Sequence, residues 1–104
     1  MSRGSRWREV EGLLDGLDGV RLKEDPRGRR WCVGQRLVAR QVDDSTLLVR
    51  CAFGPREELL AAHPETFSVR PELEAHEKVL ADVSAGDLGA LGAALRAAWE
   101  MQRR

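Results

Sequence analysis

Residues 29–52 read RRWCVGQRLVARQVDDSTLLVRCA and contain three runs that are typical of β-strands. The runs are Arg29–Val33, Arg36–Val42 and Thr46–Ala52. The first two flank Gly34-Gln35, a pair whose leading glycine suits a two-residue type II′ hairpin turn. The polar segment Asp43-Asp44-Ser45 separates the second and third runs as a three-residue turn. This stretch therefore predicts an antiparallel three-stranded meander.

Helical patterns lie on both sides of the meander. Apolar residues recur at helical spacing over residues 5–17, and again from Leu88 towards the C-terminus after the capping sequence Ser84-Ala85-Gly86-Asp87. A short helix is expected to open at Gly54-Pro55 and to end before Pro64, because proline suits the first turn of a helix and cannot continue one. Three helices are therefore expected.

The remaining segments complete the predicted fold. Residues 20–28 are rich in turn formers and predict an irregular connection. Phe67–Arg70 and Lys78–Val83 predict one or two further strands. The expected order is α-β-β-β-α-β-β-α, which indicates an α+β fold: an antiparallel sheet with helices packed on one face.

The length of 104 residues suits a single domain spanning residues 1–104, in which residues 1–5 are expected to form a disordered tail. No apolar run approaches the ~18–20 residues of a membrane span, and the N-terminal residues lack a hydrophobic signal region, so we expect a cytoplasmic protein. Cys32 and Cys51 are too few for a disulfide-stapled scaffold. Because no nucleotide-binding or hydrolase motif occurs, and His63 and His76 are the only histidines, we expect a non-enzymatic protein without cofactor or metal.

The charges are balanced overall but unevenly distributed. The chain carries 17 basic and 17 acidic side chains, which excludes a uniformly basic polyanion-binding protein. Residues 1–56 contain 12 Lys/Arg and 8 Asp/Glu, whereas residues 57–104 contain 5 and 9. Such asymmetry is found where one part of a protein has a basic binding surface, and equally where two solvated faces differ in sign.

The two turns predict how the side chains divide between the faces of the sheet. They pair Trp31 with Val38 and Arg40 with Leu48, so that alternation sorts the meander into an apolar face and a mixed face. The expected core face contains Cys32, Leu37, Ala39, Leu47, Val49 and Cys51. The opposite face contains Arg29, Trp31, Arg36, Val38, Arg40, Leu48 and Arg50.

The mixed face has two interpretations. Its arginine stems can simply cover a half-exposed sheet, or its guanidinium groups and Trp31 can contact an anionic partner. A β-bulge at either turn would exchange the faces and remove the second interpretation. The same register places Cys32 and Cys51 two strand spacings apart, ~9.5 Å, whereas a disulfide needs Cα atoms within ~7 Å. Two reduced, buried thiols are therefore expected.

Several short motifs resemble those of the MmcQ/YjbR family. Residues 30–39, RWCVGQRLVA, are similar to the family's F-x-V-x-G-K-x-F-A hairpin, and LLVRC at 47–51 to its L-x-V-K-x strand. Residues 59–67, LLAAHPETF, are similar to its L-L-x-x-x-P-x-x-F segment. His76 matches the histidine of its H-W-x-x-V motif, although Glu77 replaces the tryptophan, and Ala98-Trp99 matches its L-x-x-A-W/Y ending. The resemblance extends from about Trp7 to Met101.

This resemblance implies a CyaY-like α+β fold with a "double wing" arrangement proposed to bind DNA, and it implies no enzymatic activity. We therefore expect a small non-enzymatic binding module that contacts the phosphate backbone of DNA. Its expected contact residues are Arg27, Arg29, Arg30, Trp31, Arg36, Arg40 and Arg50, with His76 as a secondary candidate. The alternatives are a module that docks an acidic protein partner on the same Arg/Trp face and, third, a small-molecule pocket near His76 and Trp31.

Overall fold

The computed structural model describes the backbone of residues 3–104 and the side chains from Arg6 onward. The helices are α1 (Arg3–Asp15), α2 (Phe53–Ala62) and α3 (Leu88–Gln102), with a short 3-10 helix η1 (Pro71–Leu73). The strands are β1 (Val20–Asp25), β2 (Gly28–Val33), β3 (Arg36–Gln41), β4 (Thr46–Arg50), β5 (Phe67–Ser68) and β6 (Lys78–Asp82). The predicted α+β fold is confirmed. The predicted tail is wrong for residues 3–5, which belong to α1, while residues 1–2 lie outside the described part.

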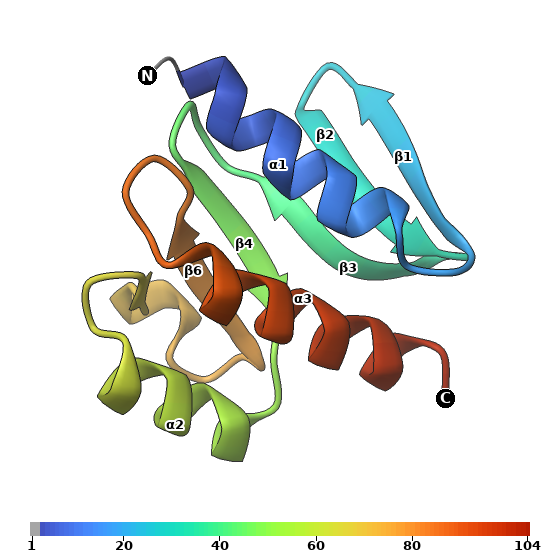
Figure 1. Cartoon of the computed structure of the whole chain (residues 1–104). Helices are drawn as coiled ribbons and strands as arrows, with labels where there is room; N and C mark the ends of the chain where they lie inside the picture. Colours follow the sequence, from blue (N-terminus) through green and yellow to red (C-terminus); the bar gives the residue numbers. More distant parts are fainter. Residues whose placement is uncertain (1–2) are drawn as a thin grey trace.

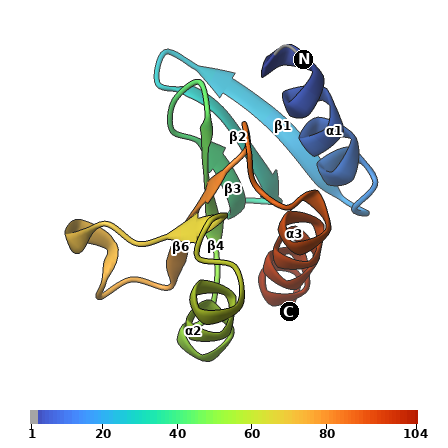
Figure 2. The same cartoon turned by 60° about the vertical axis from the view of Figure 1, so that its left-hand side comes forward.

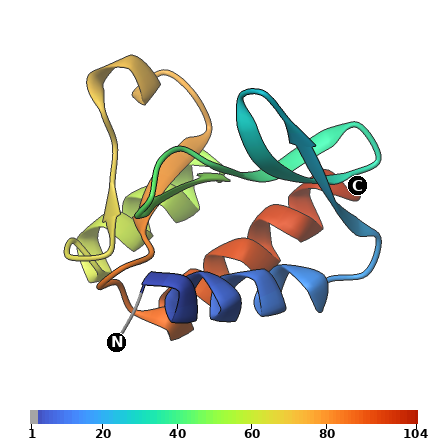
Figure 3. The same ribbon diagram turned by 90° about the horizontal axis from the view of Figure 1, so that it is seen from above.

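All six strands form one antiparallel sheet in the order β1-β2-β3-β4-β6-β5. The α1, α2 and α3 helices cover one face of this sheet, as Figures 1 and 2 show. On the other face, the turn between β1 and β2 and the segment that carries η1 project away from the helices on either side of the central strands (Figure 3). We call this helix-free side the open face.

The first strand of the sheet was not expected. Residues 20–25 form β1, which pairs with β2 from Val20–Val33 to Asp25–Gly28, so the prediction of an irregular connection is wrong. Only Pro26 and Arg27 separate the two strands, and Gly28 follows them with φ of 120°, a value open to glycine. Charged side chains are typical of an edge strand, and they obscure the alternation of apolar and polar residues by which strands are recognised.

A β-bulge alters the predicted register between β2 and β3. The pairs Val33–Arg36 and Cys32–Leu37 form as expected, but Trp31 pairs with Ala39 and not with Val38. The extra residue lets Val38 and Ala39 both be fully buried, and it turns Trp31 into the core, where 1% of its surface is exposed. The predicted pairing of Arg40 with Leu48, between β3 and β4, is confirmed.

The core lies between the sheet and the helices. Trp7 and Leu14 of α1 and Leu91 and Leu95 of α3 pack against the buried residues of β2, β3, β4 and β6. Two indole groups anchor these helices to loops: Trp7 Nε1 donates to Asp44 O at 2.6 Å, and Trp99 Nε1 donates to Asp18 O at 2.7 Å. The N-terminus of α3 is capped by Asp87, whose pKa is lowered by the hydrogen bond from the Ala90 amide.

Candidate functional site

The open face gathers cations in a row across three neighbouring strands. Lys23 of β1 pairs with Arg30 of β2, and Arg30 pairs with Arg40 of β3. Directly paired residues of an antiparallel sheet point to the same face with Cα atoms ~4.5–5.5 Å apart. Like charges in such positions destabilise a sheet, so this row costs folding free energy unless anions offset it.

A second like-charge pair lies on the same face. Arg50 of β4 pairs directly with Lys78 of β6. Arg50 follows Leu48 by two residues, and Leu48 pairs with Arg40, so alternation places Arg50 on the side of Arg40. Arg21, two residues before Lys23, lies there as well. We call this set the basic cluster: Arg21, Lys23, Arg30, Arg40, Arg50 and Lys78.

The basic cluster has few partners of its own. Arg30 Nη2 lies 3.5 Å from Asp25 Oδ2, and Lys23 Nζ donates to Gly34 O at 3.0 Å. Within residues 6–104, the side chains of Arg21, Arg40, Arg50 and Lys78 make no ion pair or hydrogen bond, and Arg50 Nε is buried without a hydrogen-bond partner. These guanidinium and ammonium groups therefore retain donors for an external ligand.

An apolar floor lies among these cations. Leu48 and Leu80 pair directly with each other on β4 and β6, and each is 3% exposed. Charges beside a low-dielectric surface are screened less than charges surrounded by water. The apolar surface of Leu48 and Leu80 therefore reduces screening and strengthens the attraction between the basic cluster and an anion over the central strands.

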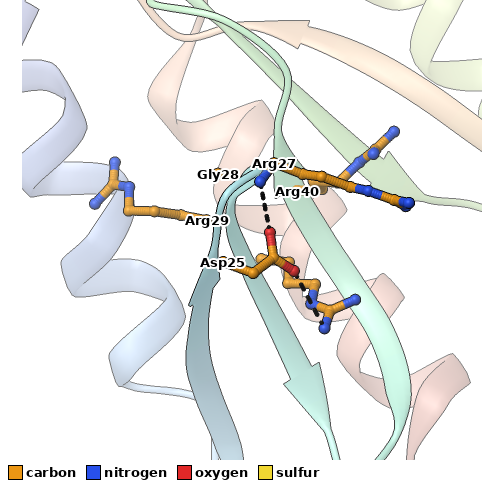
Figure 4. A pocket seen from close by; sticks show the side chains of 6 residues that line it. Asp25, Arg27, Gly28, Arg29 and Arg40 are labelled. Carbon is orange, nitrogen blue, oxygen red and sulfur yellow. Dashed lines mark hydrogen bonds and ion pairs between the residues drawn. The ribbon is translucent and has the colours of Figure 1, made fainter.

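A small hollow lies at one end of the basic cluster, beside the turn between β1 and β2. It has a volume of about 40 Å³ and is lined by Asp25, Arg27, Gly28, Arg29, Arg30 and Arg40. Figure 4 shows Arg27 and Arg40 projecting to one side of these strands, whereas Arg29 projects to the other side, towards α1. Asp25 Oδ1 accepts a hydrogen bond from the Arg27 amide at 2.9 Å, which holds the turn. The hollow therefore joins Arg27 to the basic cluster.

Arg29 is part of the core structure and does not belong to the open face. Its guanidinium carbon lies 5.4 Å from the ring centre of Trp7 and 5.2 Å from that of Trp31. Its Nη1 lies 2.5 Å from Glu11 Oε2, and its Nε donates to Gln41 Oε1 at 2.8 Å. Cation–π contacts and ion pairing commit this side chain to joining α1 to the sheet.

Trp31 and Arg36 also do not lie on the open face, where the predicted register had placed them beside Arg40. The bulge turns Trp31 into the core, so the prediction that it lies beside Arg40 on one exposed face is wrong. Arg36 pairs with Val33 at the far end of the hairpin, and its Nη1 donates to Arg104 O at 2.8 Å. The open face therefore keeps Arg30, Arg40 and Arg50 of the predicted set, with Arg27 at its border.

Sequence reasoning missed three cations of the cluster. Arg21 and Lys23 lie in the strand that was predicted to be irregular, and Lys78 begins a strand whose neighbour was not predicted. The alternation of Val20, Leu22 and Glu24 with basic residues, followed by a Pro-Arg-Gly turn, is the signal that could have identified β1.

Arg56 holds the segment that leads to Lys78. This side chain is 7% exposed, and its guanidinium donates to the carbonyl oxygens of His76 at 2.8 Å and Glu74 at 3.1 Å, with longer bonds to Leu73 and Lys78. Bonds to several backbone carbonyls use the planar fork of donors that lysine lacks. His76 is thus held through its backbone carbonyl, and its exposed side chain makes no ion pair or hydrogen bond with a residue of the basic cluster within the described part of the chain.

The two cysteines are free and buried, which confirms the prediction of reduced thiols. They occupy opposite faces: Cys51 belongs to the core beneath the helices, whereas Cys32 neighbours Trp31 along β2 and points to the open face. The predicted placement of Cys32 on the core face is therefore wrong. Burial raises the pKa of the Cys51 thiol, opposed by Arg56, so this sulfur is a poor nucleophile at neutral pH.

The third alternative, a small-molecule pocket near His76 and Trp31, does not coincide with the larger cavities of the structure. Two cavities of about 240 Å³ each lie between α2 and α3, and both are lined by Cys51, Pro55 and Ala97. Neither is lined by Trp31 or His76. Over the described chain, no group of three or more His, Cys, Asp or Glu side chains could hold a metal ion. No helix among residues 3–104 has the length and apolar character needed to cross a membrane.

The chain was compared with protein-family models, curated proteins and solved structures. No family model, no curated protein and no solved structure matches the chain. The resemblance to the MmcQ/YjbR family therefore stays a prediction made from its short motifs.

Proposed function

We propose that this protein is a small non-enzymatic module that binds the phosphate backbone of DNA through the basic cluster on its open face. The observation that carries the proposal is the direct pairing of like charges, Arg30 with Arg40 and Arg50 with Lys78, without enough acidic partners to offset them. Phosphate groups lying over these pairs would remove the repulsion and satisfy the free guanidinium donors.

The dimensions of the basic cluster suit a short length of nucleic acid. Lys23 on β1 and Lys78 on β6 are separated by four strand spacings, ~19 Å, a distance that corresponds to roughly six stacked nucleotides of one strand. Glu72 and Glu74 are exposed on and beside η1, and they border the far side of the face. The polyanion would therefore lie over β1–β4 and the start of β6 at Lys78, and it would avoid the η1 segment.

The proposed binding is to phosphates and not to bases. Of the aromatic side chains, Trp7, Trp31, Trp99 and Phe67 are buried, and the exposed Phe53 lies on α2 against the Arg56 guanidinium, so no strand of the open face presents an exposed aromatic ring for base stacking. Guanidinium contacts to phosphate position a protein on DNA but distinguish sequences poorly. We therefore expect weak sequence preference.

Two further observations bear on the proposal. The MmcQ/YjbR resemblance supports DNA as the ligand, and a cytoplasmic location stays part of the proposal. A protein partner with an acidic segment would satisfy the same guanidinium groups, and it is the alternative that the experiment must separate.

The proposal is tested by titrating a duplex of ~20 base pairs with the protein at several salt concentrations. If about five cations contact phosphates, the logarithm of the association constant should fall with the logarithm of salt concentration with a slope of about −4.5. Duplexes of different sequence should give the same slope and similar affinity. A slope near zero, or binding to a poly-glutamate peptide that is tighter than binding to the duplex at every salt concentration, would contradict the proposal.

A further inference from the structure

We infer that Asp25 is an internal competitor for phosphate, and that the hollow formed by Arg27, Arg30 and Arg40 is the phosphate subsite it partly occupies. This inference rests on the proposed function and concerns how that site is regulated. Among the described residues, Asp25 is the one acidic residue whose carboxylate forms an ion pair with a member of the basic cluster.

The geometry of Asp25 resembles that of a bound oxyanion. One carboxylate oxygen accepts the Arg27 amide at 2.9 Å, and the other lies 3.5 Å from Arg30 Nη2. A phosphate group uses the same kinds of donor, namely a backbone amide of a turn and a guanidinium. The carboxylate thus makes the contacts that an external oxyanion would make at this position.

The competitor is held loosely. The side chains of Arg30 and Asp25 are 48% and 33% exposed, and at 3.5 Å their contact is longer than a strong charge-assisted bond. Arg40, which pairs with Arg30 and lines the same hollow, makes no such contact with Asp25 among the described ion pairs. A phosphate can therefore approach from the side of Arg40 and displace the carboxylate from Arg30 without unfolding the turn.

The test compares Asp25→Asn with Glu24→Gln in duplex titrations. Both substitutions remove one negative charge from adjacent residues of β1, but Glu24 pairs with Arg29 and lies on the helix-covered side. The amide oxygen of asparagine can still accept the Arg27 N–H, so the turn is preserved. Asp25→Asn should raise duplex affinity about 8-fold at ~0.1 M salt and steepen the salt slope by about 0.9, whereas Glu24→Gln should change affinity less than about 2-fold.

A double-mutant cycle supplies a second test that does not depend on one variant. With Arg30→Gln present, Asp25→Asn should lose most of its effect, because the carboxylate no longer has a guanidinium to occupy. If Asp25→Asn and Glu24→Gln act equally while wild-type protein keeps its steep slope, the competitor is excluded and the proposed function stands. If wild-type protein shows no salt-dependent duplex binding, both fall. Inorganic phosphate should displace duplex from the wild-type protein more than chloride of equal ionic strength does, and this excess should shrink in Arg30→Gln; no excess over chloride would exclude the hollow as a phosphate subsite.

Discussion

Replacing Arg40 and Arg50 together with alanine is expected to weaken duplex binding about 60-fold at ~0.1 M salt, because each lost phosphate contact reduces the salt slope by about 0.9. The two residues belong to different like-charge pairs, with Arg30 and with Lys78, and make no ion pair within the described chain. Their loss should therefore leave the fold intact or stabilise it slightly. Fluorescence anisotropy of a labelled duplex at several salt concentrations measures both the affinity and the slope.

The matched control removes the same charge from the helix-covered side. Arg8 lies exposed on α1, and Arg96 lies exposed on α3, where it contacts Glu100. If the position of charge matters more than its total, the double replacement of Arg8 and Arg96 with alanine should change duplex affinity by much less than the open-face variant. Equal losses for the two variants would indicate that the protein attracts DNA through net charge alone, and would count against a defined face.

Replacing Trp31 with alanine is expected to lower the free energy of unfolding by about 3–5 kcal/mol, the range measured for a buried tryptophan or phenylalanine. The bulge places Trp31 in the core with 1% of its surface exposed, and the ring also contacts the Arg29 guanidinium. Urea unfolding followed by circular dichroism measures the change, with Arg40→Ala as the exposed comparison that should stay within about 0.5 kcal/mol of wild type.

This variant decides between the two registers. If β2 and β3 paired without a bulge, Trp31 would lie on the face of Arg40, and its removal would cost little stability but reduce ligand binding. A loss of less than 1 kcal/mol would therefore contradict the observed core, whereas a large loss with unchanged duplex affinity per folded molecule would confirm that Trp31 is structural.

Much of the architecture could be predicted because the local signals are strong. The turn at Asp43-Asp44-Ser45 correctly predicts the pairing of Arg40 with Leu48, and Pro64 correctly ends the second helix. The bulge could not be predicted, because Leu37, Val38 and Ala39 are all apolar and suit either register. The burial of Trp31 beneath α1, together with that of Val38, favours the bulged form, and this gain depends on the whole fold.

The residues of the candidate site could be predicted only where the strands that carry them had been recognised. Arg40 and Arg50 were identified from alternation within strands that were correctly recognised, whereas Arg30 was named as a contact residue although the assumed alternation placed it opposite Arg29 and Trp31. Arg29 was misplaced, although alternation counted from Arg30 puts it on the opposite face, because the assumed register grouped it with Arg40. Lys23 was missed because the consecutive charged residues 23–25 obscure the alternation that begins at Val20 and Leu22.

NMR can show whether DNA phosphates lie over the basic cluster on the open face. Amide chemical shifts of isotope-labelled protein are followed during titration with a short duplex at low salt. We expect the largest changes in β1–β4 and at the start of β6, at and beside the basic cluster, while α1 and α3 stay unchanged and the changes disappear as salt is added. Changes centred on the cavities between α2 and α3, or the absence of any change at low salt, would contradict this position of the phosphates.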